Sequence, residues 1–171
     1  MMASVKSAKA ALVPLLFATL TASALSLTGC GNENNIVHKS EPKDDTITSV
    51  EEMPERLTEA MKSVSGCRMT IEQGNDVTWT LRDGEDSVGS VSIDSEDETV
   101  TIMIDEAESD LQAERMAHMA IASVLACNPS YDYSDAQDVA LETITEDKCR
   151  DNGISYIVGT KGNRYVLIIE L

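Results

Sequence analysis

Histidine, cysteine and the many carboxylates are the side chains in this sequence that could carry nucleophilic, redox or metal chemistry. The chain has four cysteines and two histidines, and no two cysteines stand at the C-x-x-C spacing of redox motifs and zinc knuckles. Glu114 and His118 are four residues apart in a segment with helical spacing, so both could reach one metal ion. Two ligands do not make a site, and the sequence has neither an H-E-x-x-H pattern nor a third histidine. We therefore predict no metal site, and a solvent-facing Glu114–His118 pair.

The densest group of carboxylates runs from Asp94 to Glu98 (DSEDE). It lacks the D-x-D-x-D-G spacing and the central glycine of a calcium-binding loop, so it predicts an acidic hairpin turn, with weak surface calcium binding as the alternative. The sequence has no Gly-rich phosphate loop and no G-x-S-x-G elbow. Acidic residues are so frequent that no pair can be singled out for acid–base catalysis. The sequence therefore predicts no catalytic residue and no cofactor.

The charge balance bears on possible partners. The chain has 13 Lys and Arg against 30 Asp and Glu, a formal net charge of −17. Such a surface repels nucleic acid, because binding to phosphates requires clustered Lys and Arg. We therefore expect no nucleic-acid partner.

The elements that must position these residues follow from hydrophobic periodicity. A helix is predicted from Ser49 to Gly66, capped at Thr48 or Ser49. Four alternating strands follow, with apolar residues on one face and Thr, Ser, Glu or Arg on the other; they are centred on residues 67–71, 77–81, 91–93 and 100–104. Residues 107–127 and the segment after Ser134 predict two more helices, and residues 154–159 and 164–171 a second hairpin. This order predicts an α+β fold, in which helices cover one face of an antiparallel sheet made of a four-stranded meander and the C-terminal hairpin.

The N-terminus has the three zones of a secretory signal. Lys6 and Lys9 precede an apolar stretch over residues 10–27, which ends in Leu27-Thr28-Gly29-Cys30. This ending resembles the lipobox of bacterial lipoproteins. The resemblance implies a diacylglyceryl group on the Cys30 thiol and cleavage just before Cys30, whose new amino group is usually acylated as well. The alternative is an ordinary signal peptide cut after Ala22-Ser23-Ala24, which would leave Cys30 as a plain thiol.

The expected organisation is a signal peptide over residues 1–29, the lipidated Cys30 with a polar tether over residues 30–48, and a single domain over residues 49–171. Export permits a disulfide, and three cysteines remain after Cys30 is lipidated. Counting chain reversals places Cys67 and Cys149 at the same end of the domain, so the sequence predicts a bond between them. Cys127 is predicted to be a buried thiol.

The sequence thus predicts a protein tethered to the bilayer through acyl chains on Cys30. It would lie on the outer face of the cell membrane, or on the outer membrane if the cell has two. The expected function is a non-catalytic domain that binds an envelope or extracellular protein. Two alternatives remain: a small hydrolase that uses carboxylates, and a carrier of a small ligand between the helix layer and the sheet.

Overall fold

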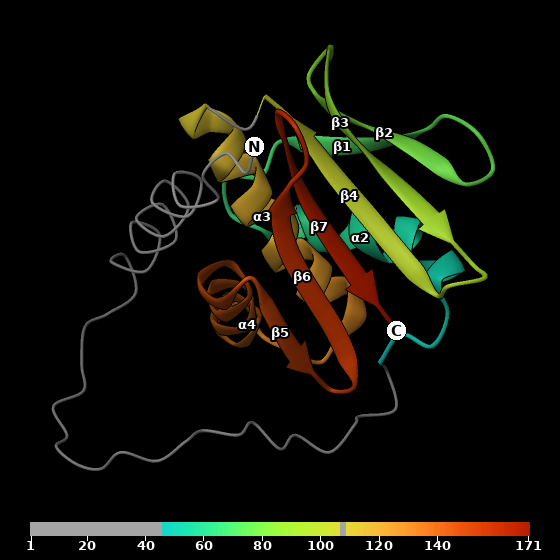
Figure 1. Ribbon diagram of the computed structural model, residues 1–171, viewed down its shortest axis with the longest axis vertical. Helices are drawn as coiled ribbons and strands as arrows, with labels where there is room; N and C mark the ends of the chain where they lie inside the picture. Colours follow the sequence, from blue (N-terminus) through green and yellow to red (C-terminus); the bar gives the residue numbers. More distant parts are fainter. Residues whose placement is uncertain (1–45, 107–108) are drawn as a thin grey trace, which may run out of the picture.

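The computed structural model describes residues 46–106 and 109–171. Cys30, the signal segment and nearly all of the predicted tether lie outside the described residues. The described chain forms two layers, with one sheet and three α-helices on one of its faces (Figure 1). The predicted α+β class, with an antiparallel sheet, is therefore confirmed. None of the described helices is both long and apolar enough to cross a membrane.

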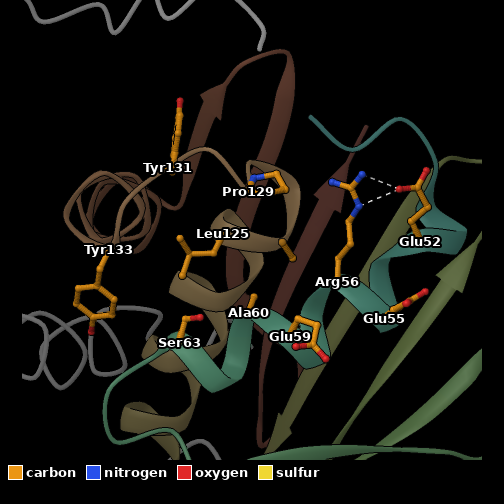
Figure 2. A pocket seen from close by; sticks show the side chains of 11 residues that line it. Glu52, Glu55, Arg56, Glu59, Ala60, Ser63, Leu125, Pro129, Tyr131 and Tyr133 are labelled. Carbon is orange, nitrogen blue, oxygen red and sulfur yellow. Dashed lines mark hydrogen bonds and ion pairs between the residues drawn. The ribbon is translucent and has the colours of Figure 1, made fainter. Parts of the chain in front are cut away.

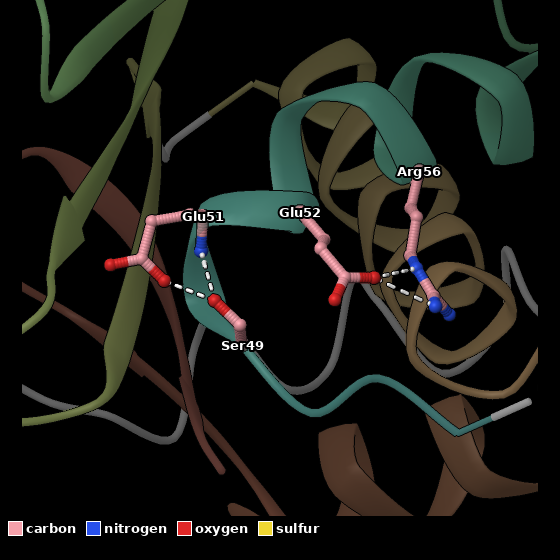
Figure 3. A network of polar contacts seen from close by, with 4 residues as sticks. All are labelled: Ser49, Glu51, Glu52 and Arg56. Atoms are coloured by element: carbon pink, nitrogen blue, oxygen red, sulfur yellow. Dashed lines mark hydrogen bonds and ion pairs between the residues drawn. The ribbon is translucent and has the colours of Figure 1, made fainter.

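The chain enters the fold at Ile47, two residues before the predicted start of the domain. Ile47 is buried, and its backbone N–H donates a hydrogen bond to the carbonyl of Cys127 at 2.9 Å. The short 3-10 helix η1 (Val50–Glu52) and the helix α2 (Met53–Ser63) follow. The Ser49 hydroxyl caps the start by accepting from the backbone N–H of Glu51 (Figure 3), as N-cap residues do.

The sheet has seven strands in the order β1-β2-β3-β4-β7-β6-β5, and every neighbouring pair is antiparallel. Four form the predicted meander: β1 (Met69–Gln73), β2 (Thr78–Asp83), β3 (Asp86–Asp94) and β4 (Thr99–Asp105). The predicted C-terminal hairpin is β6 (Ile154–Thr160) and β7 (Arg164–Glu170). β7 lies between β4 and β6, an interior position that agrees with its apolar sequence YVLIIEL.

One strand was not predicted from the sequence. β5 (Lys148–Asp151) pairs with β6 and forms the edge of the sheet opposite β1. Its four residues, KCRD, include a single apolar side chain, so alternation gives almost no signal. Asp147 has a φ of 65°, a left-handed conformation that ends the preceding helix abruptly and starts this strand.

The helix layer contains α2, α3 (Asp110–Cys127) and α4 (Tyr133–Glu146). Alanines along α3 let the neighbouring helices approach closely, and α3 is the central helix, packed against both α2 and α4. Asn128-Pro129 ends α3, and the side chain of Asp132 caps α4 by accepting from the backbone N–H of Asp135 at 2.9 Å. The cap lies two residues before the predicted one at Ser134.

The two faces of the sheet differ, as predicted. The face under the helices carries fully buried side chains such as Leu81, Ile102 and Leu167. The opposite face, called the open face below, carries the alternate residues of each strand, which retain partial or full exposure with the exception of the buried Ser155.

An ion pair ties the helix layer to the sheet at one end. The Arg115 guanidinium on α3 donates from Nη2 to Asp83 Oδ2 on β2 at 2.5 Å, and a second donation runs from Nε at 3.2 Å. Their side chains are only 11 % and 17 % exposed. This contact with Arg115 holds the pKa of the Asp83 carboxyl below its ordinary value, against the opposing effect of burial.

Asp83→Asn is expected to lower the free energy of unfolding by about 2 kcal/mol at pH 7, because Arg115 would lose a charged partner while largely buried. Since the folded-state pKa of Asp83 is lowered, its contribution is present above the unfolded-state value of about 3.9 and is lost as the pH falls through the folded value. Urea unfolding should be measured at pH 7 and in steps below pH 4. The difference in free energy of unfolding between wild type and variant should shrink as the pH falls. As a control, Glu72→Gln breaks the exposed ion pair with Arg82 and should cost less than about 1 kcal/mol. An Asp83→Asn effect that does not change with pH would contradict this account.

Candidate binding groove

A groove of about 630 Å³ lies between α2 and the C-terminal half of α3, and it continues along the loop that leads into α4 (Figure 2). Its apolar and aromatic lining consists of Ala60, Leu125, Ala126, Pro129, Tyr131 and Tyr133. Its polar lining comes mainly from α2 and the residue before it: Glu52, Glu55, Arg56, Glu59 and Ser63. The groove is therefore a two-sided site, with carboxylates on one wall and tyrosines, Leu125 and Pro129 on the other.

The spacing on α2 produces the acidic wall. Glu52, Glu55 and Glu59 recur at intervals of three and four residues, so they lie along one side of the helix, and the lining places that side at the groove. Glu52 forms an ion pair with Arg56 at 2.8 Å (Figures 2 and 3), and Glu59 is 2.6 Å from Lys62 in an exposed pair. The lining residues include three carboxylates and one guanidinium, so the lining carries a net negative charge.

The aromatic wall is held in place from behind. The Tyr131 hydroxyl donates to Asp151 Oδ2 at 2.8 Å and accepts from Asn152 Nδ2 at 2.9 Å. Asn152 Nδ2 also donates to Asn128 Oδ1 at 3.0 Å, and Asn128 Nδ2 donates to the Tyr156 hydroxyl at 3.2 Å. This network joins the α3–α4 loop to the β5–β6 hairpin, so the position of the Tyr131 ring is fixed by the fold. Burial also raises the pKa of the Tyr133 phenol, which lines the groove.

Three comparisons bear on the chain as a whole. No family model, no curated protein and no solved structure matches it.

The structure agrees with the prediction for Cys127 and corrects the prediction for Cys67 and Cys149. Cys127 is fully buried, as predicted, and burial raises its pKa to about 12. The predicted bond between Cys67 and Cys149 is wrong for this structure, in which Cys67, Cys127 and Cys149 are all free thiols. Cys67 lies two residues before β1 and Cys149 lies in β5, and these two strands are the opposite edges of the sheet. Six strand spacings of about 4.8 Å separate those edges, against a limit of about 7 Å between bonded Cα atoms.

The Glu114–His118 pair also differs from the prediction. Glu114 is exposed, but His118 is buried at 7 % exposure and lies beside Gly66 rather than in solvent. Burial lowers the pKa of His118, and the nearby Glu114 carboxylate opposes that shift. Among the described residues, no group of three or more His, Cys, Asp or Glu is placed to hold a metal ion.

The acidic segment from Asp94 to Glu98 forms the β3–β4 turn, as predicted. The Asp94 carboxylate accepts from the backbone N–H groups of Glu96 and Asp97 at 3.0 and 3.3 Å, an arrangement typical of turns that begin with Asp.

The groove itself was not predicted. Its tyrosines come from the α3–α4 loop and the first residue of α4, and its acidic wall comes from charged positions that a helical pattern simply assigns to the surface. One signal was available: two of the four tyrosines stand at positions 131 and 133, directly after the helix-ending Asn128-Pro129. A polar loop that carries two aromatic residues is often a binding loop.

Proposed function

We propose that this chain is a lipid-anchored, non-catalytic binding domain on the outer face of a bacterial membrane, and that its groove binds a positively charged segment of another envelope or extracellular protein. The Leu27-Thr28-Gly29-Cys30 ending supports the anchor. The groove supports the binding role, and the observation that carries it is the pairing of an acidic wall with an aromatic one.

The chemistry of that pairing favours lysine and arginine side chains. Each has an apolar stem and a charged end, so the stem can lie on the Tyr131 and Tyr133 side of the groove while the charge meets Glu55 or Glu59. Cations are also attracted to the faces of aromatic rings, by about 0.5–1 kcal/mol at exposed sites. The overall charge of −17 adds long-range attraction for a basic partner.

The two alternative functions find less support. A carboxylate hydrolase needs an acid whose pKa is raised so that it can donate a proton near neutral pH. Among the described residues, Glu51 and Asp83 are the carboxyl groups with clearly shifted pKa values; both values are lowered, and neither residue lines the groove. A small-ligand carrier was expected to hold its cargo between helices and sheet, whereas this groove lies between helices and is lined by no strand residue.

Binding of a synthetic decalysine peptide tests the proposal. The full-length protein is reconstituted in a zwitterionic bilayer, which does not itself attract the peptide, and binding is followed by calorimetry. Replacing both Glu55 and Glu59 with Gln should weaken binding about tenfold, because each ion pair with the peptide contributes roughly 0.7 kcal/mol. The same peptide with acetylated lysines should bind far more weakly.

The matched control removes two exposed carboxylates elsewhere, through Glu85→Gln and Glu96→Gln in the β2–β3 and β3–β4 turns. It makes the same change in net charge, so it should weaken binding less than twofold at physiological salt, where distant exposed charges are screened. Equal weakening by both double variants would show that only the overall charge attracts the peptide, and the groove proposal would fail.

A further inference from the structure

The open face of the sheet is not covered by any described part of the chain. All three described α-helices pack on the opposite face (Figure 1). Most antiparallel sheets with one solvated face carry polar residues there, and the β1–β3 half of the open face follows that rule with Thr70, Thr80, Ser90 and Ser92. The half formed by β4, β7 and β6 does not.

Four apolar side chains meet at this second half, and we call them the apolar centre: Met103, Ile157, Val166 and Ile168. The strand register makes them neighbours, because Met103 is opposite Val166 and Ile168 is opposite Ile157. Each keeps intermediate exposure, so together they form a continuous apolar patch rather than scattered surface residues.

Around the apolar centre, the charges are balanced. Arg164 pairs with Asp105 at 2.7 Å, and Lys148 lies 4.0 Å from Glu170. A third pair, Arg82 with Glu72, lies on β2 and β1 in the other half of the same face. The chain as a whole is strongly acidic, at −17. The open face is therefore a surface on which an equally acidic protein could dock without like charges meeting at the contact, while salt screens the long-range repulsion between the two chains.

One end of the open face combines both signs of charge around a hollow. A hollow of about 630 Å³ is lined by Met103, Asp105, Glu106, Lys161 and Arg164, together with the Gly162-Asn163 turn. Two cations and two anions therefore surround one apolar side chain. A twofold interface needs such a patch, because each group must meet the same surface on the partner with its positions exchanged.

We infer that two copies of this chain associate through their open faces, with the apolar centres in contact and the ion pairs at the rim. The five longest strands, β2, β3, β4, β7 and β6, average about seven residues each. At about 4.8 Å between strands and 3.4 Å per residue, they present a surface of roughly 24 × 24 Å, or about 600 Å² per partner. That is the low end for specific interfaces, so the dimer is weak and reversible, with a dissociation constant on the order of micromolar. The groove lies in the other layer and stays accessible, so this inference is independent of the proposed function.

Sedimentation equilibrium of the full-length protein in detergent tests the dimer, over a series from about 1 to 300 µM that brackets a micromolar constant. The wild type should pass from monomer to dimer. Ile168→Lys places a charge in the apolar centre and should weaken association about tenfold or more. Thr101→Lys, opposite Ile168 on β4, should do the same without removing an apolar contact from the fold. It serves as the second variant if Ile168→Lys does not fold.

Leu111→Lys is the matched control, because Leu111 is 43 % exposed on α3, away from the open face, and the charge change is identical. This variant should dimerise like the wild type. A wild type that stays monomeric across the series would overturn the inference. So would a dimer that Leu111→Lys weakens as much as the two open-face variants do.

Discussion

Gly89→Ala is expected to lower the free energy of unfolding by about 3 kcal/mol or more, a large share of the roughly 5–15 kcal/mol that stabilises an ordinary domain. Gly89 lies in β3, between Leu81 of β2 and Ile104 of β4. The register shifts beside it, since Leu81 is opposite Gly89 but Arg82 is opposite Ser87. A Cβ atom at this bulge would lie 2.0 Å from the carbonyl oxygen of Met103. Because the obstacle is backbone, the clash can be relieved only by moving two central strands apart.

Gly159→Ala is the matched control, in β6 of the same sheet. No atom lies within 4 Å of a Cβ built there, so the change should be within about 1 kcal/mol and is expected to be slightly stabilising. Urea unfolding can be followed by the fluorescence of Trp79, the single tryptophan, which pairs with Val91 of β3. Similar unfolding midpoints for the two variants would show that β3 and β4 are less closely constrained than the structure indicates.

The regular elements could be predicted because their periodicity is strong. Val100, Ile102 and Ile104 alternate with Thr99, Thr101 and Met103, and this pattern alone defines β4 and its buried face. Ser49 caps the start of the first helical segment through its side chain, whereas the predicted end at Gly66 is three residues too late. The helix α2 ends at Ser63, and Gly66, with a φ of 82°, lies in the turn that follows. Such signals involve only residues that are close neighbours in the chain, so they can be recognised from the sequence alone.

The lateral order of the strands could not be predicted in the same way. Counting chain reversals predicts the end of the domain at which a residue lies, but it does not predict where the residue's strand lies across the sheet. Because the C-terminal hairpin adds through β7 to β4, β5 is displaced to the far edge and Cys149 with it. The bulge at Gly89 and the groove could not be predicted for the same reason. They depend on contacts between segments that are far apart in sequence, and such contacts leave little trace in local patterns.

Cys30→Ser is expected to abolish lipid attachment completely and to leave the precursor uncut. Cys30 lies outside the described residues, so the expectation rests on the resemblance of Leu27-Thr28-Gly29-Cys30 to a lipobox. Attachment of the diacylglyceryl group requires a sulfur nucleophile, and a serine hydroxyl is far less nucleophilic than a thiolate. Each buried methylene contributes about 0.8 kcal/mol to membrane binding, and two or more acyl chains are needed for stable anchoring. Loss of the thiol should therefore remove the whole anchor rather than weaken it.

Labelled fatty acid and intact mass measure this outcome directly in a bacterial host. The wild type should carry the label on a chain that begins at Cys30, and the Cys30→Ser chain should carry none and keep residues 1–29. Cys67→Ser is the control, because Cys67 is a half-buried thiol of the folded domain and its loss should leave labelling unchanged. If the wild type never takes up the label and the variant is cut after Ala22-Ser23-Ala24 like the wild type, the N-terminus is an ordinary signal peptide. The protein would then be released from the membrane, and its groove would act on partners in solution.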